Sequence, residues 1–117
     1  MPHHIDPRMH ECIDRCQSCQ AICLETISHC LRLGGKHAAA EHITMMMTCA
    51  EICETSARFM LLSSPFHART CEVCAELRDA CAQDCDRLAG DDEMMRQCAE
   101  ICRRCAESCR QMAAMRA

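Results

Sequence analysis

Cysteine is the residue in this sequence best able to do chemistry, and it is unusually abundant. The chain has 15 cysteines among 117 residues, a share that indicates a specialised scaffold rather than an ordinary domain. Because 15 is an odd number, the cysteines cannot all pair as disulfides within one chain. Most neighbouring cysteines are separated by three, four or seven residues. The full set is Cys12, Cys16, Cys19, Cys23, Cys30, Cys49, Cys53, Cys71, Cys74, Cys81, Cys85, Cys98, Cys102, Cys105 and Cys109.

A spacing of four residues brings two cysteine side chains together on one face of a helix, with both sulfurs pointing the same way. A disulfide across that spacing would need a dihedral angle that continuous helical backbone does not easily allow. Two such sulfurs could instead share a soft metal ion, and thiolate ligands select Cu(I) among few other ions. Six pairs have this spacing: Cys12–Cys16, Cys19–Cys23, Cys49–Cys53, Cys81–Cys85, Cys98–Cys102 and Cys105–Cys109.

Charge balance favours the same ion. Uncompensated thiolates are very costly in a dry core, so the thiols should be protonated and neutral when no metal is bound. Each Cu(I) would displace about one proton, which leaves the loaded core near neutral. If thiolates bridge neighbouring ions, the capacity is on the order of one Cu(I) per cysteine. The sequence therefore predicts that each chain binds multiple Cu(I) ions.

Other uses of cysteine fit the spacing less well. Structural zinc sites usually join two short-range cysteine pairs from loops or turns, whereas Cys16-x-x-Cys19 and Cys71-x-x-Cys74 lie inside longer helical series. No Cys-Pro closes a run of the kind that binds iron–sulfur clusters in ferredoxins. The remaining alternative is that cysteine is only a small hydrophobic core residue, but filling four helix seams with it would sacrifice much stability.

Four long helical segments should position these cysteines. Signals for helix starts and stops are Asp6-Pro7, Gly34-Gly35, Ser64-Pro65 and Gly90 with Asp91-Asp92, and they bound segments rich in good helix formers. The predicted helices span roughly 7–33, 37–62, 65–89 and 92–114, with residues 1–6 as a flexible tail. Matched lengths and short links predict one all-α domain over residues 1–117, an antiparallel up-down-up-down four-helix bundle. Each helix carries its cysteines on a 3.5-residue seam, so the core should be lined with cysteine.

In this combination of features the sequence resembles the bacterial copper storage proteins. The resemblance covers about residues 9 to 113. It rests on the Cys-x-x-x-Cys pairs of all four segments, on Ser64-Pro65, and on the run Cys98-x-x-x-Cys102-x-x-Cys105-x-x-x-Cys109. It implies a four-helix bundle that holds Cu(I) by cysteine pairs, a homotetramer of bundles, and storage, homeostasis or detoxification of copper rather than catalysis. Residues 1–12 contain no apolar export signal, which points to the cytosolic branch of the family and to a cytoplasmic location.

Three positions depart from the pattern of that family. Thr26 and His42 stand where the seam would accept cysteine, and Arg78 interrupts the cysteine series of the third segment. These residues should lower the copper capacity relative to richer members. Because a buried arginine is expensive when it is unpaired, we expect Arg78 to swing outward and Leu77 to seal its layer.

The predicted topology gathers different side chains at the two ends of the bundle. One end should collect imidazole and thioether groups, which bind Cu(I) weakly and without charge and so suit transfer. We expect copper to enter there through His42, Met46 and Met94 or Met95, so His42, Met46 and Met94 join the cysteines as predicted metal ligands. The alternative is that these methionines are ordinary core filler. Apolar side chains should plug the opposite end, namely Phe59, Leu61, Leu62 and Phe66.

Composition limits the rival functions. The formal net charge is −4, and no basic run or aromatic platform indicates nucleic-acid binding. No apolar stretch is long enough to span a bilayer. A thiol oxidoreductase would need one accessible thiol of low pKa with a resolving partner, and 15 similar thiols single out no catalytic residue. A copper chaperone, a sensor or a thiol redox protein would bind few Cu(I) ions or other soft metals, so stoichiometry separates these alternatives from a store.

Overall fold

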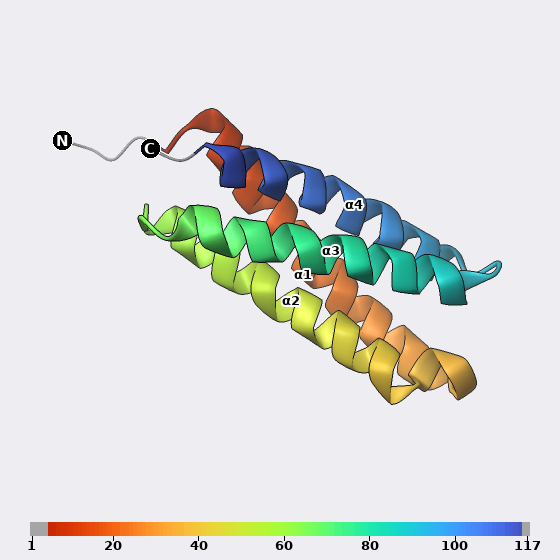
Figure 1. The fold of residues 1–117 in the computed structure, drawn as a ribbon. Helices are drawn as coiled ribbons and strands as arrows, with labels where there is room; N and C mark the ends of the chain where they lie inside the picture. The colour runs from red at the N-terminus through yellow and green to blue at the C-terminus, as the bar shows by residue number, and fades with distance from the viewer. Residues whose placement is uncertain (1–4, 116–117) are drawn as a thin grey trace.

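Four long α-helices make up most of the computed structural model, which describes residues 5–115 (Figure 1). The helices are α1 (Pro7–Leu33), α2 (Ala40–Leu61), α3 (His67–Ala89) and α4 (Glu93–Ala114), and a short 3₁₀ helix, η1 (Gly35–Ala38), links α1 to α2. The described part of the chain contains no strand. The all-α class predicted from the sequence is confirmed.

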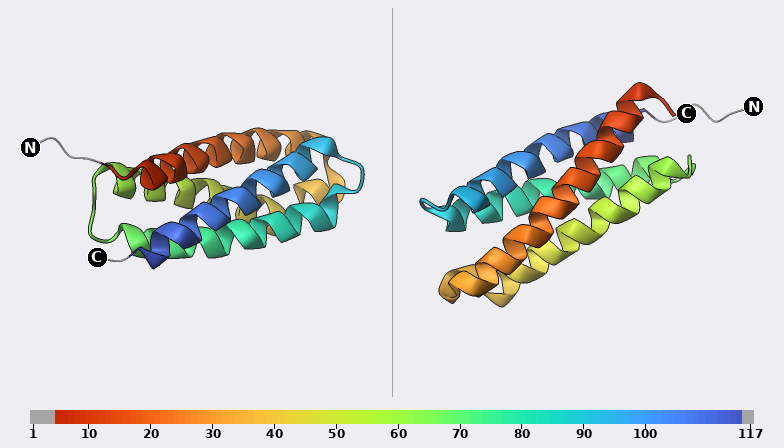
Figure 2. Two further views of the ribbon diagram at one scale, coloured as in Figure 1. Left: turned by 90° about the horizontal axis from the view of Figure 1, so that it is seen from above. Right: turned by 180° about the vertical axis from the view of Figure 1, so that it is seen from behind.

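The helices form an elongated antiparallel bundle with extents of 53 × 21 × 20 Å. Consecutive helices pack against each other, and α4 closes the ring by packing against α1. The α1–α2 and α3–α4 connections lie at one end of the bundle (Figures 1 and 2). The α2–α3 connection lies at the other end, together with the start of α1 and the end of α4. We name these the His42 end and the Met60 end, after a buried residue at each.

Capping side chains set the starts of α1 and α4, and a glycine sets the end of α1. The Asp6 carboxylate accepts a hydrogen bond from the backbone N–H of Arg8 at 2.7 Å, and Pro7 occupies the first turn of α1. The side chain of Asp92 caps α4 in the same way at 2.9 Å. Gly34 has a φ of +73°, which glycine adopts readily and which ends α1. Of the predicted tail over residues 1–6, residues 1–4 lie outside the described part, and Ile5 packs against the core.

Small and sulfur-containing side chains build the core. Cysteine, alanine and methionine supply most of its buried positions. The outer faces carry charged residues, and the ion pairs Arg103–Asp86 and Arg110–Asp79 connect α3 to α4. No helix within residues 5–115 combines the length and the apolar character that a membrane crossing requires.

The predicted plug at the Met60 end is wrong. Leu61, Leu62 and Phe66 are 49%, 76% and 59% exposed, and Phe59 is only half-buried. Met60 is buried there instead, and Met112 and Ile13 are buried on the neighbouring helices. The reason is helical phase, because Met60 follows Cys53 by seven residues and stays on the cysteine seam. The apolar residues beside Met60 are turned away from the axis.

Candidate metal centre

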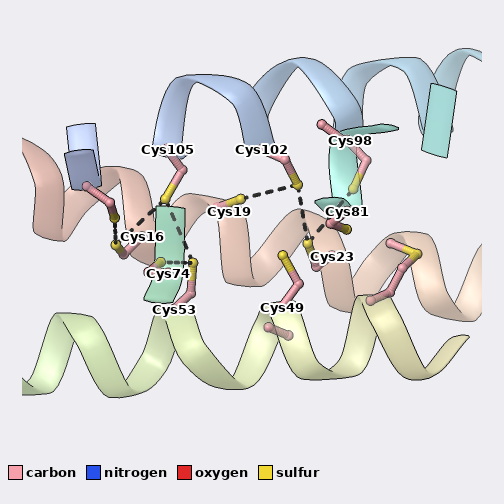
Figure 3. Close-up of a cluster of buried hydrophobic side chains, with 14 of the residues drawn as sticks. Cys16, Cys19, Cys23, Cys49, Cys53, Cys74, Cys81, Cys98, Cys102 and Cys105 are labelled. Atoms are coloured by element: carbon pink, nitrogen blue, oxygen red, sulfur yellow. Dashed lines mark hydrogen bonds between the residues drawn. The ribbon is translucent and has the colours of Figure 1, made fainter. Parts of the chain in front are cut away.

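All 15 cysteines are buried as free thiols in the interior of the bundle. Each has a relative exposure of 0%. Figure 3 shows labelled cysteines from all four helices with their sulfurs pointing toward one another along the axis. The cysteine seam predicted from the sequence is therefore the core itself.

Two groups of four sulfurs take one cysteine from each helix, and in each group all sulfurs lie within 4.8 Å of one another. The Cys16 layer consists of Cys16, Cys53, Cys74 and Cys105. The Cys23 layer consists of Cys23, Cys49, Cys81 and Cys102. Soft metal ions placed in either layer could be held by sulfurs of several helices at once.

Further sulfur–sulfur contacts connect the layers into a continuous series. Within the Cys16 layer, Cys53 lies 3.8 Å from Cys105 and 4.0 Å from Cys74. Toward the Met60 end, Cys109 lies 3.7 Å from Cys16 and 3.8 Å from Cys12, and these three form a third compact group.

The same series continues on the other side of the Cys16 layer. Cys19 contacts Cys102 at 3.7 Å, and Cys23 contacts both Cys102 and Cys98 at 3.9 Å. These contacts join different helices. The structure therefore also brings sulfurs of different helices close enough to share a soft ion, in addition to the same-helix pairs that the sequence predicts.

Hydrogen bonds between neighbouring sulfurs shift the pKa values of the thiols. Hydrogen bonding between Cys105 and Cys109 raises the pKa of Cys109 and lowers the pKa of Cys105. Burial, together with the negative charge of nearby groups, raises the pKa of Cys30 to about 11. Cys30 is therefore a neutral thiol at physiological pH, and a metal ion that binds it must displace its proton.

His42 occupies a buried and oriented position at its end of the bundle. The side chain is 1% exposed, its Nδ1 lies 2.6 Å from Asp84 Oδ2, and its Nε2 lies 3.4 Å from Cys30 Sγ. A carboxylate next to Nδ1 favours the tautomer with the proton on Nδ1, which leaves the Nε2 lone pair directed at the thiol. His42 and Cys30 could together hold one soft ion. Asp84 was not predicted, since it is one of many acidic residues in the sequence.

Two methionines line the core at the same end. Met46 and Met95 are both 0% exposed, whereas Met94 is half-buried. The structure therefore places Met95, rather than Met94, on the seam. The other two histidines of this end have protein partners: His29 Nε2 lies 2.7 Å from Asp92 Oδ2, and His37 Nε2 lies 3.1 Å from the carbonyl oxygen of Leu88.

The expectation that Arg78 swings outward is wrong. Its side chain is 0% exposed, and Nη1 donates to Cys23 Sγ at 3.2 Å, while Leu77 is only half-buried. Burial lowers the pKa of the Arg78 guanidinium, but the surrounding sulfurs raise it by more, so the group stays charged. Arg78 follows Cys71 by seven residues, and this phase on the helix directs it inward.

Thr26 is also buried, and its hydroxyl donates to the carbonyl of Ile22 at 2.6 Å.

Comparison with known proteins places this sulfur core in a family. Residues 5–114 match the family described as copper storage protein. The cysteine-rich protein YhjQ of Bacillus subtilis, itself uncharacterised, is 34% identical over 69 residues, which are 59% of this chain and 64% of that protein. The chain thus spans slightly less than two thirds of this curated relative.

Solved structures match over nearly the whole length. The Nmul_A1745 protein of Nitrosospira multiformis is 50% identical, with a TM-score of 0.86 over 92% of this chain and 96% of that one. The Cu(I)-bound copper storage protein BsCsp3 of Bacillus subtilis is 32% identical, with a TM-score of 0.84 over 91% and 98%. A cytosolic copper storage protein of Streptomyces lividans is 30% identical, with a TM-score of 0.80 over 92% of both chains. Together with the described geometry, these matches establish that the chain belongs to the copper storage protein family.

Proposed function

We propose that this chain stores multiple Cu(I) ions in the cytosol as thiolate complexes inside the bundle. The observation that carries the proposal is the pair of four-sulfur layers, each built from all four helices. Sulfur supplies nearly all the ligand atoms of this core, and it is the ligand type that favours Cu(I). The Cu(I)-bound relative BsCsp3 has the same fold.

Loading is a proton-for-copper exchange. Neutral thiols tolerate the dry core, and each thiol that loses its proton to solvent binds Cu(I) in its place, so that little net charge builds up. Sulfurs shared between neighbouring ions allow a capacity on the order of one ion per cysteine. The cysteines of both layers, the flanking cysteines and the His42 imidazole are the proposed ligands.

Copper enters at the His42 end in this proposal. Asp84 fixes the ring of His42, whose Nε2 and the Cys30 sulfur form a buried two-ligand site. Met46 and Met95 add neutral thioethers beside it, which bind Cu(I) weakly and pass it on. Cys85 lies near Cys30 and hydrogen-bonds to Cys98, which lies 3.9 Å from Cys23, so the proposed path continues through these two sulfurs to the Cys23 layer.

Storage is favoured over catalysis because no thiol is distinguished by access to solvent. A redox enzyme needs an exposed thiolate, and every cysteine of this chain is 0% exposed. A copper chaperone or sensor remains the alternative, and it predicts one or two ions per chain.

A homotetramer of bundles is the proposed assembly. Leu24 and Leu31 lie seven residues apart on α1 and are 53% and 54% exposed, so they form an apolar stripe on the outer face. Contact with another subunit would remove this stripe from water. Light scattering coupled to size-exclusion chromatography would report the mass, and a monomeric mass would refute the assembly.

The function is tested by anaerobic titration of the fully reduced protein with Cu(I) against a competing chelator. Tight binding of a number of ions on the order of the cysteine count supports a store. An endpoint of one or two ions would instead indicate a chaperone or a sensor. No tight binding would leave the sulfur layers as packing only.

A further inference from the structure

Arg78 is a feature of the core that copper storage alone does not explain. It lies on the cysteine seam of α3, three residues before Cys81, and none of its surface is exposed. Arginine side chains near a surface normally extend their charged group into water. A buried guanidinium is expensive unless something inside the protein balances its charge.

The hydrogen-bond partners of Arg78 are two cysteine sulfurs and one backbone carbonyl. Nη1 contacts Cys23 Sγ at 3.2 Å and Cys102 Sγ at 3.7 Å, and Nη2 donates to the carbonyl oxygen of Cys49 at 2.5 Å. Nε has no hydrogen-bond partner. The ion pairs formed within residues 5–115 do not include Arg78. Within residues 5–115, the nearby groups that could become its counter-charge are cysteine sulfurs, namely those of Cys23, Cys49 and Cys102 in the Cys23 layer and that of Cys19 beside it.

We infer that Arg78 is a permanent counter-cation for the copper–thiolate complex of the Cys23 layer. It allows this layer to hold one more thiolate than Cu(I), and so it lowers the copper capacity of the chain by about one ion. The inference rests on the proposed function. It adds a residue that sets the net charge of the copper–thiolate complex, and therefore the ratio of Cu(I) to thiolate in it.

Charge balance in the dry core links Arg78 to the number of bound ions. Equal numbers of Cu(I) and thiolate are neutral, so a fixed guanidinium would leave such a core with one uncompensated positive charge. Omitting one Cu(I), while its thiolate stays deprotonated, restores neutrality. The excess thiolate then accepts charge-assisted hydrogen bonds from the guanidinium, which are stronger than those between neutral groups.

The geometry places this effect in one of the two layers. Three of the four cysteines of the Cys23 layer contact Arg78, through two sulfurs and one carbonyl. The cysteines of the Cys16 layer make no hydrogen bond with Arg78. Each layer offers four cysteine sulfurs, but only the Cys23 layer lies against a guanidinium. The two layers therefore differ in the net charge of the copper–thiolate complex that each one stabilises.

The test counts copper ions in a set of position-78 variants. The reduced proteins are saturated with Cu(I) against a chelator, and native mass spectrometry resolves the number of ions per chain. Arg78→Gln removes the charge and keeps a hydrogen-bonding group, and it should bind about one ion more than the unchanged chain. Arg78→Lys keeps the charge and should bind the same number. Arg110→Gln removes a surface arginine of the same bundle and should change nothing.

Arg78→Leu is a second neutral variant should Arg78→Gln fail to fold, and it predicts the same gain. If a folded neutral variant binds the same number of ions as the unchanged chain, the inference is overturned. It is also overturned if Arg78→Lys gains an ion, because volume rather than charge would then be responsible. The copper count of the unchanged chain is measured first. If that chain binds only one or two ions, the proposed function fails, and the variants are not compared.

Discussion

Replacing Asp84 with asparagine tests whether an ionised carboxylate orients His42. Asp84 Oδ2 lies 2.6 Å from His42 Nδ1, and Oδ1 accepts from Arg87 Nη2 at 2.5 Å. A hydrogen bond to a charged group contributes about 1.5–3 kcal/mol to stability. The His42 ring is too deeply buried to replace this partner with water. Asparagine can still hydrogen-bond to His42 but carries no charge, so Asp84→Asn should lower the free energy of unfolding of the metal-free protein by about 1–1.5 kcal/mol at neutral pH, the difference between hydrogen bonds to charged and to neutral groups.

The effect should depend on pH in a defined direction. Burial raises the pKa of Asp84, but hydrogen bonds from His42 and Arg87 lower it by more, so it falls below the ordinary value of 3.8. A carboxyl group whose pKa is lower in the folded state stabilises the fold above its unfolded-state pKa. That contribution is lost as the pH falls through the folded-state pKa. The stability difference between the two proteins should therefore shrink below about pH 4.

Chemical unfolding of the reduced metal-free proteins, followed by circular dichroism at neutral and acidic pH, measures both effects. Asp86→Asn is the matched control, because Asp86 lies one half-turn away and forms an exposed ion pair with Arg103. Exposed pairs contribute about 0–1 kcal/mol. Stopped-flow uptake of Cu(I) should slow by roughly 10–100-fold in Asp84→Asn, with an unchanged final count. Equal stability losses in the two variants, with equal uptake rates, would refute the proposed role of Asp84.

Three further predictions concern the copper itself. Replacing Met46 and Met95 with leucine removes both thioethers and should change the free energy of unfolding by less than about 1.5 kcal/mol. Cu(I) uptake should become slower, while the number of ions bound at the endpoint stays the same. An unchanged uptake rate would contradict a role of these methionines in the entrance. Replacing Cys53 and Cys74 with serine should lower the number of bound copper ions by about two. Circular dichroism should show that the metal-free variant keeps its fold. An unchanged number of ions would show that the Cys16 layer holds no copper. Loading should release about one proton per Cu(I) ion. Because the pKa of Cys30 is raised to about 11, the affinity of this thiol for Cu(I) should increase with pH until the pH reaches the pKa. A pH-independent affinity at the Cys30 site, isolated by comparison with Cys30→Ser, would contradict the proton exchange.

The bundle and its sulfur core were predictable because both depend on local periodicity. Cysteines at steps of three, four and seven residues fix which face of each helix is inward, and that face does not depend on the neighbouring helices. The glycine and proline signals fixed the boundaries of α1 and α3 to within a few residues. The order in which helices surround the axis followed from their matched lengths and short links.

Other parts of the site depend on partners far apart in the sequence. Arg78 was expected outside because its cost was judged alone, and the contacts with Cys23 and Cys49 appear only when α1 and α2 pack beside α3. Asp84 could not be singled out, because its importance comes from a histidine 42 residues away in the sequence. Phe66 was assigned to the plug as one of four apolar side chains at that end, whereas the turn that precedes α3 leaves it on the surface.

The two layers that draw one sulfur from every helix have a consequence for the lifetime of the molecule. Ions shared across a layer would join four helices that the metal-free bundle holds together only by noncovalent contacts. Ligands that bind only the native state raise the free-energy cost of opening it. Proteases cleave chains that have opened. A copper-loaded bundle should thus resist digestion far longer than a metal-free one. Proteolysis in the cell would therefore remove the metal-free protein first and leave the copper-loaded protein in place.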